Sequence, residues 1–154
     1  LYADRNLDFK SLLKDCGAPK RIFDCFAMAI KKFPVFKEGH PEMPLKIKYK
    51  GWGLRATLDD FLEKRHIIIE NKTGKTEWDQ ERVDSNDQLT FQAFVHWKKY
   101  GIPPHKIILN WVNCRPNPEK LINTFETHRL LPELKMFEVR IDKVIKSLKA
   151  KKFI

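Results

Sequence analysis

Three side chains suited to metal-assisted hydrolysis lie near the ends of two strands that the sequence predicts. Asp59 lies toward the end of the first strand, and Glu70 and Lys72 lie at the end of the next, on either side of Asn71. Side chains of a strand alternate between its two faces, so Glu70 and Lys72 point the same way. The ends of neighbouring strands in a meander lie side by side, and we therefore expect Asp59 to converge with them.

Two carboxylates beside a lysine are the groups that a hard divalent cation and a water-activating amine require. Mg²⁺ prefers oxygen ligands and keeps several waters, which leaves coordination positions for a phosphate. Such a metal lowers the pKa of a bound water and offsets charge on the phosphate in the transition state. Lys72 could orient that water or neutralise the developing charge.

The hydrophobic pattern predicts the elements that must position these groups. Alternating or continuous apolar residues predict strands over 45–50, 54–62, 66–71, 106–112 and 124–131. Short connections between the first three favour an antiparallel meander, and Ile67–Ile69 suits a strand covered on both faces. The sequence Gly51-Trp52-Gly53 predicts a turn, the polar stretch 73–87 predicts a loop, and Gly101 predicts the end of the helix before it. Helices are predicted over 7–16, from Pro19 to Phe33, over 85–100 and along the last stretch, where Phe137, Ile141, Val144 and Leu148 share one face.

The length and composition are those of one folded domain over residues 1–154, and the order of the predicted helices and strands makes it an α/β domain. Of the 154 residues, 42% are hydrophobic and 32% are charged, which excludes a disordered or low-complexity chain. A formal charge of +10 favours an anionic partner. No apolar run approaches the roughly 18 residues that a membrane span needs.

Four segments in order extend the pattern beyond the Glu-Asn-Lys triplet. They are 55–61, 67–74 with its Glu-Asn-Lys-Thr-Gly end, Asp87-Gln88-Leu89, and 12–23 with Ala18-Pro19-Lys20-Arg21. Together they resemble the PD-(D/E)XK nuclease superfamily, in its RecB-like branch. The resemblance implies a restriction-endonuclease-like core, whose central mixed sheet (a meander plus added strands) is flanked by helices. It also implies a Mg²⁺- or Mn²⁺-dependent nuclease acting on DNA.

The resemblance assigns roles to individual residues. It implies that Asp59 and Glu70 bind the metal, with the backbone carbonyl of Asn71 as a third ligand. Lys72 is then the catalytic lysine, and Gln88 contacts the substrate or steadies the site.

Asp60 is the rival of Asp59, because the two are adjacent. The spacing of Ala56 and Leu58 in the family pattern favours Asp59, although Ala56 stands where the family often has Gly. A metal-binding His that many relatives carry on an upstream helix is missing. His40 and Glu42 are loose candidates for a fourth ligand.

The cysteines indicate ordinary thiols in a reducing compartment, and hence a cytoplasmic or other intracellular protein. Cys16, Cys25 and Cys114 show no paired spacing. Ala18 stands where the branches with an iron–sulfur cluster have Cys, so we expect no such cluster.

The basic residues suggest how DNA would be held. Lys46 and Lys48 share a strand face with Trp52 nearby, a combination that suits single strands or frayed ends. Residues beside the site, Thr73, Lys75 and Gln88, are further candidate contacts. The C-terminal stretch 135–152 carries seven Lys or Arg against two acidic residues, and suits either a phosphate track or a solvated face.

Each of these interpretations has a plainer alternative. Glu70 and Lys72 could form an ordinary ion pair, and Ser85 with Gln88 fits a capping box that opens a helix. At the level of function, the alternative is a basic nucleic-acid-binding module without catalysis on a nuclease-like fold. A third reading is a protein-interaction domain whose charge is incidental. The sequence leaves the oligomeric state open.

Overall fold

The structure is a computed structural model that describes residues 39–115 and 119–150. The helices predicted over 7–16 and 19–33, and the family-like stretch 12–23, lie outside these residues.

Strands β1 (Met43–Tyr49) and β2 (Trp52–Leu58) form an antiparallel hairpin. Its two-residue loop is Lys50-Gly51, where both φ angles are positive, at 48° and 86°. A type I′ turn requires positive φ at both central residues, and its twist matches the right-handed twist of the two strands that it joins. The turn predicted at 51–53 therefore lies one residue earlier, and Trp52 and Gly53 belong to β2.

The four-stranded sheet has the order β3-β4-β5-β6. Its pairs are antiparallel, parallel and antiparallel, so the sheet is mixed as predicted. The strands are β3 (Asp60–Leu62), β4 (Ile67–Gly74), β5 (Lys106–Asn113) and β6 (Ile122–Thr127). The last strand predicted, 124–131, thus begins two residues earlier and ends at Thr127, because Leu131 opens a helix.

The strand predicted over 54–62 is divided at Asp59. Its first part, β2, pairs in the hairpin, and its second part, β3, pairs with β4 in the larger sheet. Both antiparallel pairings of the predicted meander are therefore present, but in two sheets. Asp59 thus lies between β2 of the hairpin and β3 of the larger sheet, and it is hydrogen-bonded to β4.

Helices α3 (Gln80–Asp84) and α4 (Asp87–Tyr100) connect the parallel strands β4 and β5. The short α3 lies in a region predicted as a polar loop. Helix α4 ends, as predicted, at Gly101, whose φ of 78° suits glycine and whose N–H donates to the carbonyl of Trp97. A single turn of 3-10 helix, η1 (Glu63–Arg65), joins β3 to β4.

The predicted amphipathic helix is α5 (Leu131–Lys149). Phe137 is buried, but Val144 is 55% exposed, and Ile145 is buried in its place. With 3.6 residues per turn, Leu134, Ile141 and Ile145 lie to one side of Phe137 and Val144 lies to the other, so Val144 is at the edge of the buried face. Within residues 39–115 and 119–150, no helix combines the length and the apolar character that crossing a bilayer requires.

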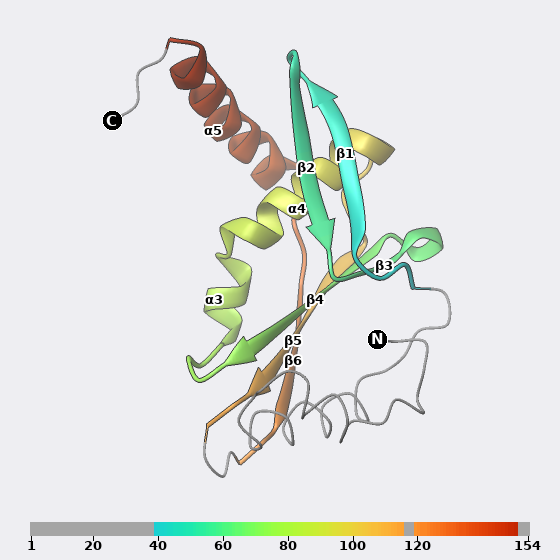
Figure 1. The fold of residues 1–154 in the computed structure, drawn as a ribbon, viewed down its shortest axis with the longest axis vertical. Coiled ribbons are helices and arrows are strands. Elements are labelled where there is room, and N and C mark those ends of the chain that lie inside the picture. The colour runs from blue at the N-terminus through green and yellow to red at the C-terminus, as the bar shows by residue number, and fades with distance from the viewer. Residues whose placement is uncertain (1–38, 116–118, 151–154) are drawn as a thin grey trace, which may run out of the picture.

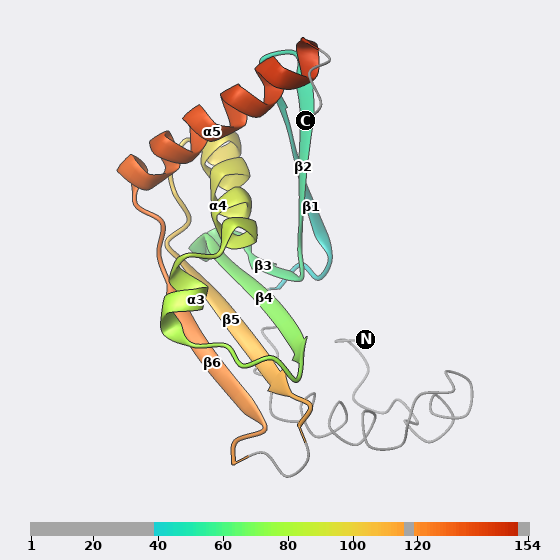
Figure 2. The same ribbon diagram turned by 90° about the vertical axis from the view of Figure 1, so that its left-hand side faces the viewer.

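The main core lies around α4. Its apolar face meets the hairpin, one face of the sheet and α5 (Figures 1 and 2). The residues Ile67, Ile68 and Ile69 are buried at 2%, 0% and 4% exposure, as expected for a strand covered on both faces. Ile68 belongs to the main core, whereas Ile67 and Ile69 form a second cluster with Leu62. Even-numbered residues of β4 therefore face α4.

Candidate functional site

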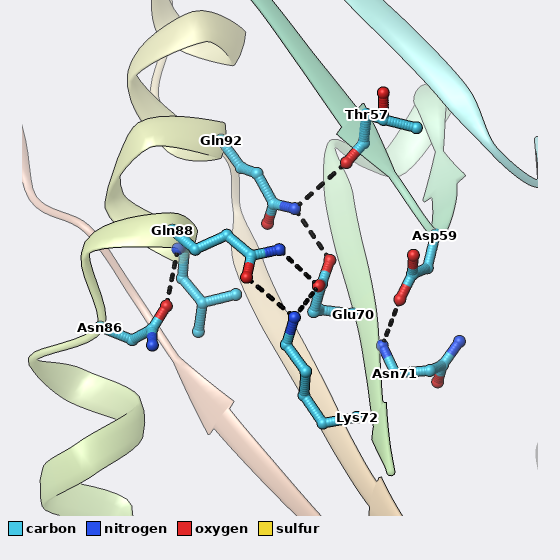
Figure 3. A network of polar contacts seen from close by, with 9 residues as sticks. Thr57, Asp59, Glu70, Asn71, Lys72, Asn86, Gln88 and Gln92 are labelled. Carbon is cyan, nitrogen blue, oxygen red and sulfur yellow. Dashed lines mark hydrogen bonds and ion pairs between the residues drawn. The ribbon is translucent and has the colours of Figure 1, made fainter.

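Glu70 and Lys72 point from β4 toward α4, on the same face as Ile68. The Glu70 side chain is 3% exposed and the Lys72 side chain 27%. Figure 3 shows the contact between the two side chains, in which Lys72 Nζ donates to Glu70 Oε1. The two atoms are 2.6 Å apart. The predicted convergence of these two residues is therefore present, with the carboxylate inside and the amine at the surface.

Gln88, in the first turn of α4, closes a ring with this ion pair. Its Nε2 donates to Glu70 Oε1 at 2.6 Å, and its Oε1 accepts from Lys72 Nζ at 2.8 Å. The capping box predicted for Ser85 and Gln88 is wrong. The N-cap is Asn86, whose Oδ1 accepts from the N–H of Leu89, so the Gln88 side chain is available to the site.

Gln92, for which the sequence pattern predicted no role, also binds Glu70. Its Nε2 donates to Glu70 Oε2 at 2.8 Å and to the carbonyl of Thr57 at 3.3 Å. It lies four residues after Gln88, on the same helix face. A glutamine in an otherwise apolar stripe was the signal available in the sequence.

Asp59 lies at the edge of β4, directly before β3 begins. Its Oδ2 accepts from the backbone N–H of Asn71 at 2.7 Å, which puts the carboxylate in the place of a strand partner. Burial raises the pKa of Asp59 above its usual value, and the bond from Asn71 opposes this. The charge of Glu70 raises the pKa further and that of Lys72 lowers it, so Asp59 is electrostatically coupled to both.

Asn71 presents its backbone and its side chain to different parts of the structure. The N–H and C=O of one strand residue point to the same edge, so the Asn71 carbonyl points toward the side where Asp59 lies. The side chain lies on the sheet face opposite Glu70. There its Oδ1 accepts from Asn110 Nδ2, and Asn110 Oδ1 accepts from the hydroxyl of Thr124.

The structure separates Asp59 from its sequence rival. Asp60 is the first residue of β3, opposite Ile69, and its Oδ1 accepts from the N–H of Phe61. Burial raises the pKa of Asp60 above its usual value. The bond from Phe61 and the charge of His40 lower the pKa, but by less than burial raises it. Asp60 therefore interacts with neither Glu70 nor Lys72.

The two candidates for a further ligand, His40 and Glu42, differ in whether they lie near Asp59. His40 is directed to Glu63, at 3.8 Å between Nε2 and Oε2. Glu42 donates its backbone N–H to the carbonyl of Asp59, and its charge raises the pKa of Asp59. Glu42 is thus near the site, whereas His40 pairs elsewhere.

Arg129 fixes the end of α4 that carries Gln88. It is 3% exposed, and its guanidinium donates to the carbonyls of Val83 and Asn86 at the junction of α3 and α4. It also donates to the hydroxyls of Thr90 and Thr127. These bonds attach the start of α4 to the end of β6.

The predicted DNA contacts fall into two groups. Lys46 and Lys48 are exposed on the hairpin face that points away from the core. Trp52 pairs with Tyr49, so alternation puts it on the opposite face from the lysines, and the predicted grouping of these three is wrong. Thr73 and Lys75 are exposed at the end of β4, next to Lys72.

The donor set at this site is one that hard cations prefer. Asp59 and Glu70 supply carboxylates and Asn71 a carbonyl, and all three donor groups are oxygen. Among residues 39–115 and 119–150, no group of three or more His, Cys, Asp or Glu side chains is arranged to hold a metal. Any cation here would therefore need the backbone carbonyl or water beside the two carboxylates.

Comparison with known proteins leaves the family open. No protein-family model matches this chain, and a search of the curated proteins gives no match. One similar solved structure is that of SSO0001, which is 18% identical with a TM-score of 0.47. The match covers 90% of this chain and 66% of that chain. A similarity at this level supports no argument about function.

Proposed function

We propose that this chain is a Mg²⁺- or Mn²⁺-dependent nuclease that hydrolyses phosphodiester bonds in DNA, on a PD-(D/E)XK core. The observation that carries the proposal is the Glu70–Lys72–Gln88 ring, beside which Asp59 accepts from the backbone N–H of Asn71, the residue between Glu70 and Lys72. Burying a carboxylate costs much free energy, and a fold without use for it would favour an apolar side chain. The net positive charge of the chain fits an anionic substrate.

Asp59, Glu70 and the Asn71 carbonyl would hold the cation. When bound, the cation would supply an activated water and offset charge on the phosphate. Lys72 would donate to the attacking water or to a phosphate oxygen as negative charge develops. Gln88 holds Lys72 from the side opposite the strand, so that the amine has a defined position.

Replacement of the lysine tests this role. Lys72→Met should lower the rate of DNA cleavage in Mg²⁺ or Mn²⁺ by about 10²–10⁴-fold, the usual contribution of a positioned proton-transfer group. The measurement is cleavage of labelled single- and double-stranded DNA, with EDTA as a second condition.

Lys106→Met is the matched control, because Lys106 also pairs with a glutamate, Glu126, at 2.8 Å. It should cleave like the wild type. Full activity of Lys72→Met, or equal cleavage in EDTA, would contradict the proposed mechanism.

The alternative is a nucleic-acid-binding module without catalysis. The observation that favours it is that both oxygens of Glu70 already accept hydrogen bonds from side chains. Such a module should bind DNA equally well with and without divalent ions and should never cut it. A protein-interaction domain would show little salt-sensitive affinity for DNA at all.

A further inference from the structure

Gln92 occupies a position that packing alone would not give to a glutamine. The residue is 2% exposed and lies among apolar residues of α4. Its Nε2 donates twice, but its Oε1 is buried without a hydrogen-bond partner in the part of the chain that the structure describes. An unpaired buried oxygen destabilises the fold. The Nε2 group of Gln92 must therefore have a role that offsets this cost.

The Nε2 group of Gln92 donates to the carboxylate of Glu70. A carboxylate offers about four acceptor positions, two on each oxygen. Glu70 Oε1 accepts from both Lys72 and Gln88, whereas Oε2 accepts from Gln92. Gln92 thus holds the second oxygen and fixes the rotation of the carboxylate, and no other described residue donates to Oε2.

Gln92 is itself held in place. The same Nε2 donates to the Thr57 carbonyl, two residues before Asp59 (Figure 3). The amide therefore links the carboxylate of Glu70 to the strand that leads into Asp59. One side chain connects the two strands that supply the candidate ligands.

We propose that Gln92 is a positioning residue, which orients the Glu70 carboxylate so that it and Asp59 receive a divalent cation together. This proposal rests on the proposed function of the site. Removing hydrogen-bond partners of metal ligands typically weakens metal affinity by about 10–100-fold. The same loss is expected here.

The test is the affinity for Mn²⁺ alone, measured by calorimetry without nucleic acid. Gln92→Met keeps the length of the side chain and removes the donor, and it should weaken Mn²⁺ binding about tenfold or more. It also leaves Glu70 Oε2 and the Thr57 carbonyl without this donor, so the melting temperature of the metal-free protein should fall, and the Mn²⁺ affinity is measured well below that temperature.

Gln80→Met is the matched control. Gln80 Nε2 likewise donates to a carboxylate and a backbone carbonyl, those of Asp84 and Glu126, away from the site. This variant should bind Mn²⁺ like the wild type. If Gln92→Met also binds like the wild type, the positioning role is overturned. If the wild type itself binds no Mn²⁺, the proposed function fails together with it.

A measurement on the wild type decides the matter should Gln92→Met not fold. Addition of Mg²⁺ should shift the side-chain amide signals of Gln92 in ¹H–¹⁵N spectra, because the acceptor of its hydrogen bond changes its charge environment. The amide signals of Gln80 should stay in place. Unshifted Gln92 signals at saturating Mg²⁺ would overturn the proposal.

Discussion

At the scale of single residues, the site depends on which atoms each carboxylate presents. Asp59 and Asp60 are neighbours of the same type, and both have a pKa raised by burial. Only Asp59 is coupled to Glu70 and Lys72, because it accepts from Asn71 at the edge of β4. Asp60 accepts from the next backbone N–H and is coupled to His40 instead.

This difference predicts opposite outcomes for one substitution at two adjacent positions. Asp59→Asn should lower Mn²⁺ affinity and DNA cleavage by about a hundredfold or more, since it removes a charged ligand. Asp60→Asn should leave both within about twofold of the wild type. Calorimetry and the cleavage assay measure the pair, and equal losses in both variants would contradict the assignment of Asp59.

At the scale of elements, the start of α4 decides what Gln88 can do. A helix begins with unpaired N–H groups that a capping side chain satisfies. Here Asn86 Oδ1 accepts from the N–H of Leu89, while the Ser85 hydroxyl donates backward to the carbonyl of Glu81 in α3. The helix therefore begins one residue later than a Ser85 cap would require, and Gln88 reaches Glu70.

The capping arrangement predicts a difference in stability between neighbours. Asn86→Ala should lower the free energy of unfolding by about 1 kcal/mol, the usual cost of losing an N-cap. Ser85→Ala should change it by less than about 0.5 kcal/mol, as is usual at exposed positions. Urea denaturation measures both. A larger loss for Ser85→Ala than for Asn86→Ala would indicate that Ser85 is the N-cap. Gln88 would then belong to a capping box and not to the site.

At the scale of the whole molecule, α4 packs against the hairpin, the larger sheet and α5. Its C-terminal half carries a buried histidine. His96 is 0% exposed. Its Nδ1 lies 3.1 Å from the carbonyl of Ile102, which only accepts, so Nδ1 carries the hydrogen. Nε2 of the neutral ring then accepts from Nδ1 of His66, at 3.1 Å. Burial lowers the pKa of His96 to about 4, and the neighbouring His66 contributes to this.

This histidine predicts a loss of global stability in mild acid. The unfolded chain takes up a proton near the ordinary pKa of 6.5, whereas folded His96 resists it until about pH 4. The contribution of His96 to the free energy of unfolding is therefore complete above about pH 6.5. It decreases by about 3 kcal/mol in all as the pH falls toward 4. Urea denaturation of the wild type and His96→Gln measures this, since the variant should lose less stability over that range. Parallel curves would contradict the prediction.

Sequence patterns identified what depends on local order along the chain. Hydrophobic alternation and the isoleucine triplet located the strands, and Gly101 located the end of α4, because side-chain periodicity and left-handed φ are properties of short segments. The convergence of Glu70 with Lys72 followed from their spacing on one strand. The same reasoning misplaced the hairpin turn by one residue, because Lys50 adopts a positive φ that is usual for glycine. It missed α3 because a helix of five residues is too short to show a hydrophobic period.

Tertiary structure alone decided the rest. The bend at Asp59 divides one predicted strand between two sheets, because β3 pairs with β4 while β2 packs on α4. Register put Trp52 on the face away from Lys46 and Lys48, and packing brought Gln92 onto Glu70. The sequence by itself thus determined which groups lie on each element. How those elements pack determined which groups meet, because contacts between residues far apart in the chain depend on the register and burial of whole elements.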